Sequence, residues 1–481
     1  MSNKSLAPDG ENQINASPTK SFFVDMLTRD IELRDAILDL LDNSLDGVLR
    51  TQQVKKPNTK SRDLPYDGYE ARIWFGRDTF QISDNCGGIS RDILQNYAFR
   101  LGRPDSIKDQ NLATVGLYGI GMKRAIFKMG DSCTVTTRYK NTASEVTISP
   151  KWLKDDDNWK LDFKEIDHNS LSLGTTIIVT GLYDDIKSEF DIEKNREFVE
   201  LFELTVSTHY SYIIQKGFKV FINDKPVRAK KINLQIDHNS SRKSRLAPFM
   251  YKGKIGNVDV DLVVGLYRDI PSPQELDKLD EGGRFRREEA GWTIICNDRV
   301  IVANDTSHVT GWGEGDVPKY HTQFIAISGV VRFTSNHPKE LPLTTTKRGI
   351  NLTSALYADV KNIMRQGLKH FTGFTNKWKI DPVGRKKVYS ETVPVDPWAA
   401  MALVEEKDWK QSRKFGGDIF IPTLPIPKSK HDTDPEIRFR RSLSEVQLLG
   451  EYFFGDPTVK ASLIGETCFE KYLKLAQSER Y

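Results

Sequence analysis

Apolar residues recur every three or four positions between residues 30 and 50, and charged residues separate them. This period places the apolar side chains on one face of a helix. The sequence therefore predicts an amphipathic helix over 30–50, carried by Leu33, Ile37, Leu40, Leu41, Leu45 and Val48. Further helices are predicted at 91–99, 122–129, 193–212, 354–369, 444–454 and 459–477.

Short segments rich in β-branched and aromatic residues lie between these helices and predict strands. They occupy residues 71–75, 79–82, 132–139, 145–149, 175–180, 219–222, 258–266, 291–302 and 324–333. Helices and strands are mixed along the chain, which indicates an α+β fold class with helices mainly on one face of the first sheet. The polar, glycine-containing segment 101–121 is long for a loop, and long loops in compact domains are usually functional.

The length of 481 residues suggests about three domains, at roughly 150 residues each. We expect a flexible N-terminal arm over 1–20, an α+β domain over 21–190 and a second domain over 191–375. A third region, 376–481, has a Pro-rich stretch and two terminal helices, so it is expected to be mostly helical.

Charge and cysteine content exclude some classes of protein. Lys and Arg number 70 against 66 Asp and Glu, and a net charge of +4 does not indicate a general nucleic-acid binder. The four cysteines are far apart and show no metal-ligand spacing. No apolar run approaches the roughly 20 residues that cross a bilayer. We therefore expect a cytoplasmic protein with no membrane partner.

The first predicted helix also carries polar residues on a common face. Asp39, Asn43 and Asp46 fall in one narrow sector at about 100° per residue. One interpretation is a functional cluster. The alternative is an acidic face in solvent, since Asp35 and Asp42 lie close by.

A second polar element, Asp84-Asn85-Cys86-Gly87-Gly88, directly follows a predicted strand. It is either an ordinary turn or a base-binding site. A carboxylate at this place accepts a hydrogen bond from an exocyclic amine, and neighbouring glycines let a flat base approach the backbone. Adenine has such an amine where guanine does not.

The third element runs from Gly116 to Lys123, where a loop enters a helix. Glycines let backbone N–H groups turn toward phosphate oxygens, and a helix N-terminus adds partial positive charge. The alternative is a flexible turn.

These three elements, in this order, resemble the ATP-binding fold shared by DNA gyrase, the heat-shock chaperones, histidine kinases and MutL (the GHKL superfamily). Residues 39–46 resemble its N-box, 84–88 its Asp-x-Gly-x-Gly box, 119–123 its lid box, and 174–177 its fourth box. The chain departs from the pattern at Cys86, which shifts the glycine spacing, and at Asp39, where glutamate is commoner.

The resemblance implies a Bergerat-type α/β sandwich that binds ATP and Mg²⁺. In that reading Asn43 binds the metal, Asp84 reads the adenine amine with support from Thr175, and Asp39 orients or activates the attacking water. The ATP-binding residues implied alongside these are Asp46, Gly88, Gly116, Gly119, Gly121, Met122 and Lys123.

Beyond the first domain, residues 291–301 resemble the strand-turn-strand of the transducer in MutL and the microrchidia (MORC) ATPases. This implies a ribosomal-S5-like transducer domain. Residues 343–350 resemble the loop that brings a catalytic lysine, here Lys347, to the γ-phosphate; Lys339 is the competing candidate.

Over residues 22–370 the chain looks nearest to prokaryotic MORC-like ATPases. That resemblance implies slow hydrolysis, an ATP-dependent homodimer, clamping of DNA or of a partner protein, and a possible role in antiviral defence. Two alternatives stay open: a chaperone-like switch without nucleic-acid contact, and a nucleotide-binding scaffold that does not hydrolyse ATP. The basic runs 385–387 and 438–441 are either phosphate contacts or solvated surface.

Overall fold

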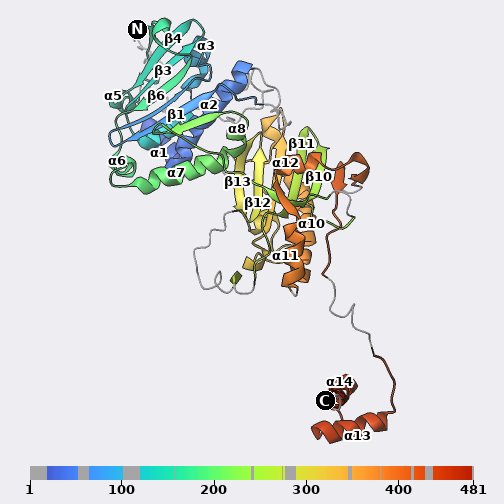
Figure 1. Ribbon diagram of the computed structural model, residues 1–481. Helices are drawn as coiled ribbons and strands as arrows, with labels where there is room; N and C mark the ends of the chain where they lie inside the picture. Colours follow the sequence, from blue (N-terminus) through green and yellow to red (C-terminus); the bar gives the residue numbers. More distant parts are fainter. Residues whose placement is uncertain are drawn as a thin grey trace, which may run out of the picture. The chain divides into compact units, whose positions relative to one another are not determined.

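The computed structural model describes residues 19–52, 64–100, 120–156, 158–239, 243–272, 275–276, 289–344, 349–379, 381–412, 416–427 and 437–478. The chain forms two compact units, Met1–Ile426 and Pro427–Tyr481. The larger unit contains two sheets, each with its own hydrophobic core (Figure 1).

The first sheet has eight strands in the order β5-β4-β3-β6-β2-β1-β7-β8. Neighbouring strands are antiparallel except β1 and β7, which are parallel. The strands are β1 (Glu70–Gly76), β2 (Thr79–Asp84), β3 (Cys133–Tyr139), β4 (Thr142–Ile148), β5 (Phe163–Ile166), β6 (Gly174–Val179), β7 (Lys219–Ile222) and β8 (Lys225–Pro226).

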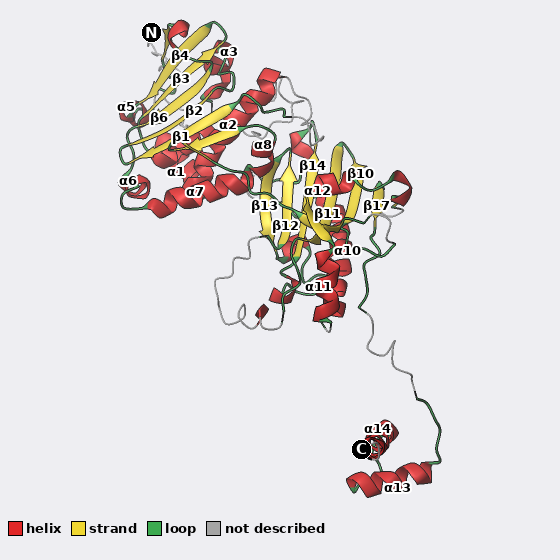
Figure 2. Ribbon diagram, in the orientation of Figure 1, coloured by secondary structure: helices red, strands yellow, loops and turns green. Residues whose placement is uncertain are grey.

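Helices α2 and α7 run alongside this sheet (Figure 2), and α2 packs closely against α4. Buried residues alternate with partly exposed ones along β1, so one face of the strand joins the core. The helices are α1 (Lys20–Thr28), α2 (Leu33–Gln52), α3 (Arg91–Ile93), α4 (Gly121–Met129), α5 (Pro150–Lys154), α6 (Asp184–Phe190), α7 (Arg196–His209) and α8 (Ser211–Gln215). A π-helix, Leu94–Ala98, continues α3.

The second sheet has seven strands in the order β13-β12-β14-β11-β10-β17-β16, and the long helix α10 packs on β10, β11 and β14. Its strands are β10 (Phe249–Ile255), β11 (Val258–Leu266), β12 (Gly291–Cys296), β13 (Arg299–Asp305), β14 (Ile327–Thr334), β16 (Lys410–Gln411) and β17 (Asp418–Phe420). The remaining elements are β9 (Leu234–Asp237), β15 (Thr392–Val395), α10 (Ala355–Trp378), α11 (Pro382–Ser390) and α12 (Pro397–Ala402).

Two features of the predicted domain division are corrected. The strand at 219–222, expected in the second domain, is β7 and pairs with β1 in the first sheet. Residues 381–426, expected in a mostly helical third region, supply β15, which pairs with β9, and β17, which pairs with β10. Each pairing joins strands more than a hundred residues apart, so no local pattern in the sequence reveals it.

The smaller unit contains the two predicted terminal helices, α13 (Leu443–Phe454) and α14 (Ala461–Ser478). Ser442 and Glu445 form a capping box at the start of α13, which satisfies the first backbone N–H groups of that helix. Gly450 and Ile464 are the buried residues among those described in the two helices. Across the described part of the whole chain, no helix is both long and apolar enough to span a bilayer.

Candidate nucleotide site

Three carboxylates of α2 are buried rather than solvated. Asp39, Asp42 and Asp46 are 2%, 1% and 3% exposed, whereas Asn43 is exposed. The interpretation of this face as a solvated acidic surface is therefore wrong. Buried carboxylates need compensating partners, and the partners of Asp39 and Asp42 come from α4 and from the second sheet.

Asp84 lies at the end of β2, in contact with α2 and β6. Its Oδ2 accepts a hydrogen bond from Ser44 Oγ at 2.8 Å, and its Oδ1 accepts from the backbone N–H groups of Cys86 at 2.9 Å and Thr175 at 3.3 Å. Desolvation raises the pKa of Asp84, and these three bonds oppose that effect. The carboxylate is thus oriented by three donors from three elements, as a base-reading group requires.

The expected support from Thr175 involves a second threonine. Thr175 Oγ1 lies 3.1 Å from Thr137 Oγ1 on β3, which also accepts the backbone N–H of Ile89 at 2.8 Å. Thr137 and Thr175 are register partners across β3 and β6. The pair joins the strand carrying Thr175 to the residue that follows Gly87-Gly88.

Gly88 has a left-handed backbone conformation, which favours glycine. Its φ is +69°, and a β-carbon there would lie 2.0 Å from the carbonyl oxygen of Arg138. On the other side of the turn, a β-carbon at Gly47 of α2 would lie 2.8 Å from the carbonyl oxygen of Cys86. Glycine thus lets the Asp84 turn fit tightly between α2 and β3.

Asp39 contacts the N-terminal end of α4. Arg124 donates to Asp39 Oδ2 through Nε at 3.2 Å and through a second, shorter bond from its terminal nitrogen. A β-carbon at Gly121, the first residue of α4, would lie 3.3 Å from the same oxygen. The predicted water-orienting carboxylate therefore sits beside the helix terminus predicted to face phosphates, but it is already paired with a guanidinium.

The side chain of Lys123 points elsewhere. It is 3% exposed, and its Nζ donates to the carbonyl oxygen of Ala98 at 3.0 Å. Burial lowers its pKa to about 8. The hydrogen-bond partner Ala98 is the last residue of the π-helix Leu94–Ala98, and the approach of Lys123 to phosphates stays a prediction. Lys123 and the buried Met122 also belong to the N-terminus of α4, which can bind a phosphate through its backbone N–H groups.

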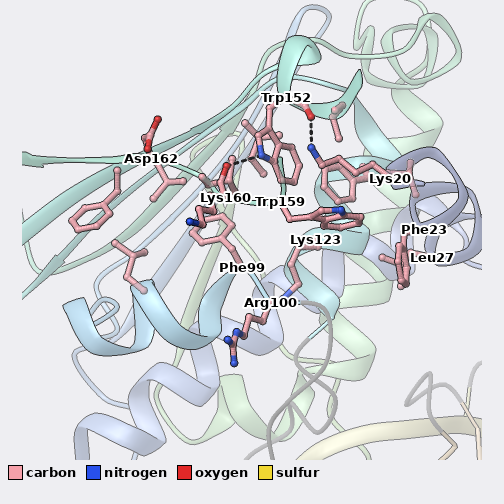
Figure 3. A pocket seen from close by; sticks show the side chains of 18 of the residues that line it. Lys20, Phe23, Leu27, Phe99, Arg100, Lys123, Trp152, Trp159, Lys160 and Asp162 are labelled. Carbon is pink, nitrogen blue, oxygen red and sulfur yellow. Dashed lines mark hydrogen bonds between the residues drawn. The ribbon is translucent and has the colours of Figure 1, made fainter. Parts of the chain in front are cut away.

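Lys123 lines a separate cavity of about 640 Å³ with aromatic walls (Figure 3). Trp152 lies in its wall, accepting at its carbonyl oxygen from Lys20 Nζ at 2.6 Å and donating from Nε1 to the Lys160 carbonyl at 2.9 Å. Asn43, Asp84 and Thr175 are not among its lining residues. This cavity is therefore distinct from the candidate nucleotide site.

Several predicted residues lie outside the described part of the chain: Gly116, Gly119 and Lys347. The ends of the loop that carries Lys347 are described, because Leu343 and Ile350 form an isolated antiparallel bridge and the Thr344 N–H donates to Gly349 at 3.1 Å. Lys339 is exposed on a short 3₁₀ helix, Pro338–Glu340.

Three further residues belong to this site and were not predicted from the sequence: Ser44, Thr137 and Arg124. Ser44 directly follows Asn43, so its position in the N-box was an available signal. Thr137 and Arg124 gave none, because their roles depend on strand register and on how α4 packs against α2.

The residues present fit a nucleotide-bound magnesium ion. Asn43 offers an exposed amide oxygen one helical turn from Asp39, and Mg²⁺ is usually held by few protein oxygens together with substrate phosphates and water. Within the described residues no group of three His, Cys, Asp or Glu side chains forms a metal cluster. A metal here would depend on the phosphates for most of its ligands.

Comparison with known proteins agrees with this geometry for the first region. Residues 31–179 match the family model described as histidine kinase-, DNA gyrase B- and HSP90-like ATPase. This span contains α2, the Asp84 turn, α4 and β6. No curated protein matches the chain. Residues 31–179 are therefore similar to the ATPase domain of histidine kinases, DNA gyrase B and HSP90, and this similarity supports ATP binding and hydrolysis by the region.

Proposed function

We propose that this protein binds MgATP through α2, the Asp84 turn and α4, hydrolyses it slowly, and uses nucleotide binding to bring two copies together as a clamp on DNA or on a partner protein that acts on DNA. The observation that carries the proposal is the Asp84 carboxylate, held by Ser44 and two backbone N–H groups at a strand end. This arrangement suits the amino group of adenine.

In this proposal Asn43 supplies the protein ligand to Mg²⁺, whose charge offsets that of the phosphates. Gly88 allows the base to approach, and Asp46 supports the N-box from within the core. The first turn of α4, with Gly121 and Met122, faces the phosphates, and the segment 101–121 acts as the lid that includes Gly116 and Gly119.

Asp39 is proposed to orient the attacking water, and Lys347 to stabilise the charge that develops on the transferred phosphoryl group. The pairing of Asp39 with Arg124 supports slow turnover, because the guanidinium competes with the attacking water for hydrogen bonds to the same carboxylate oxygen.

The second region is proposed to be an S5-like transducer and the protein to be a MORC-like cytoplasmic ATPase, with defence as one possible setting. The run 438–441 is exposed throughout, whereas in the run 385–387 Lys386 and Lys387 are exposed and Arg385 is buried, which favours 438–441 for contact with phosphates. Arg385 is 4% exposed and pairs with Asp269 at 3.1 Å. The assignment of Arg385 to a phosphate-contacting run is therefore corrected.

Size-exclusion chromatography of the apo, ATP-analogue-bound and ADP-bound protein, with and without duplex DNA, tests the proposal. We expect a dimer with the ATP analogue only, and DNA binding that weakens steeply with salt. A dimer without DNA binding supports the chaperone-like switch instead. If single-turnover assays detect no hydrolysis, the protein is instead a nucleotide-binding scaffold that does not hydrolyse ATP.

A further inference from the structure

The turn between β12 and β13 points away from its own sheet toward the first region. Asn297 and Asp298 have φ values of +46° and +68°. Asn297 fixes the turn to β14, because its N–H donates to Phe333 at 3.0 Å and its side chain exchanges two hydrogen bonds with the Ser335 backbone at 3.1 and 3.0 Å. The next two residues, Asp298 and Arg299, are thereby presented at a fixed position.

Arg299 makes a buried ion pair with α2. Its Nε lies 3.0 Å from Asp42 Oδ1, and both side chains are 1% exposed. A second nitrogen donates to the carbonyl oxygen of His209 at 3.0 Å, and the guanidinium lies 4.1 Å from the ring centroid of Tyr210. The guanidinium is thus enclosed by α2, the end of α7 and β13.

Tyr210 also binds α2 directly. Its hydroxyl donates to the Leu38 carbonyl oxygen at 3.0 Å and is also hydrogen-bonded to the Asp42 carboxylate. The same turn has a second anchor on the first region, since Asp298 accepts from Lys216 at 2.6 Å and from Tyr66 at 3.1 Å. Two adjacent residues of one hairpin therefore hold the first region: Arg299 pairs with α2, and Asp298 with Lys216 and Tyr66.

Asp42 directly precedes Asn43 in the same helix, and Asp39 lies three residues earlier. A rotation or translation of α2 that breaks the Asp42–Arg299 pair also moves Asn43 and Asp39, because a helix moves as a rigid element. Separating the pair leaves a buried charge without its partner, which is strongly unfavourable. The pair therefore restricts the positions that α2 can adopt.

We infer that Arg299 is a positioning residue of the nucleotide site: by holding Asp42, it sets the place of Asn43 and Asp39, so that affinity for MgATP depends on a residue of the second region. The inference rests on the proposed MgATP site on α2. It assigns to the hairpin a part in nucleotide binding, separate from the catalytic lysine proposed on the loop at 343–350.

The test uses the whole 481-residue chain and three variants of it. Arg299→Gln removes the charge, and Tyr210→Phe removes only the hydroxyl beneath it. Arg332→Gln is the matched control, because Arg332 is a buried arginine of the same sheet, 7% exposed, that pairs with Asp261 at 2.6 Å within that sheet. Calorimetry gives the affinity for a magnesium-bound ATP analogue, kinetics give KM and kcat, and thermal melting gives stability.

We expect Arg299→Gln to weaken nucleotide binding roughly ten-fold and Tyr210→Phe about three-fold, with KM rising in parallel. Arg332→Gln should lower the melting temperature while leaving affinity within about two-fold of the wild type. Hydrogen exchange without nucleotide should be faster in α2 for Arg299→Gln than for the control.

Wild-type protein that binds no MgATP would overturn the proposed function, whatever the variants do. Wild-type binding together with native affinity in folded Arg299→Gln overturns the inference alone. If Arg299→Gln does not fold, Tyr210→Phe decides: native affinity in that variant, with α2 exchange unchanged, overturns the inference.

Discussion

Arg124 on α4 and Asp39 on α2 form an ion pair at the place where the proposed nucleotide site meets the first turn of α4. The side chains are 11% and 2% exposed, so solvent screens the pair little. Arg124 fixes the carboxylate but also competes with water for its lone pairs. If Asp39 orients the attacking water, it does so while its carboxylate is bonded to Arg124.

Asp39→Asn is therefore expected to bind ATP with near-native affinity and to lose hydrolysis, by about 100-fold in kcat, because the amide cannot accept a proton. The closed dimer should accumulate. Single-turnover hydrolysis and size-exclusion chromatography measure the two effects. Asp42→Asn is the comparison variant, and because it weakens the pair with Arg299 it should lower affinity as well. If it instead stops hydrolysis without loss of affinity while Asp39→Asn turns over normally, the base is misassigned and the N-box register with it.

Asn43→Ala should abolish the magnesium dependence of nucleotide binding, because it removes the protein oxygen proposed to hold the metal. We expect a loss of roughly 10- to 100-fold in MgATP affinity, the range for a lost hydrogen bond or ligand to a charged group. Calorimetry with and without magnesium measures it. Since Asn43 is exposed, the melting temperature should hardly change, and unchanged MgATP affinity would remove Asn43 from the site.

Asp84→Asn should weaken ATP binding strongly, because its amide can present a donor to the adenine amine. The raised pKa of Asp84 gives a pH dependence as well. As the pH falls toward that pKa the carboxyl gains a proton, so ATP affinity should decrease in acid in the wild type and not in Asp84→Asn.

The contribution of Asp84 to the free energy of unfolding changes with pH in the opposite direction to its contribution to ATP affinity. With the folded-state pKa raised, the unfolded state loses the Asp84 proton at lower pH, so this group's contribution to stability declines as pH rises between the two values. Titrations of ATP affinity and of the free energy of unfolding against pH separate the effects. Equal affinity of the wild type for ATP and GTP would contradict the role of Asp84.

Lys347→Ala should leave nucleotide binding largely intact and lower kcat about 100-fold, because a charge near the transferred phosphoryl group matters most in the transition state. Lys339→Ala, the exposed lysine on the preceding 3₁₀ helix, is the control and should turn over normally. If Lys339→Ala lowers kcat and Lys347→Ala does not, the catalytic lysine is Lys339.

Lys123→Met should keep nucleotide affinity within about three-fold, because the Lys123 ammonium is bonded to Ala98 rather than directed to the α4 terminus. Its pKa is lowered from 10.5 to about 8 by burial. Between these values the unfolded state binds more protons, so wild-type stability should rise with pH in this window. Lys123→Met should lack that rise, and a large loss of affinity would instead show that the ammonium reaches the phosphates.

The sequence by itself determined the local elements. The apolar period of residues 30–50 predicted α2, observed at Leu33–Gln52, and the predicted strand and Asp-Gly turn at 79–88 appear as β2 and a turn with glycine at positive φ. These features are readable because helix period, strand composition and turn chemistry are properties of neighbouring residues. The order of the boxes also sufficed to suggest the ATPase family.

Only the tertiary structure decided which charges meet. In the sequence Asp42 is one of several acidic residues on a helix face, and solvent is the ordinary place for it. Its partner Arg299 lies 257 residues further along the chain, and Arg124 lies 85 residues from Asp39. A buried carboxylate is stable only where a cation is brought to it, and that depends on how β13 and α4 pack against α2, which no pattern of neighbouring residues encodes.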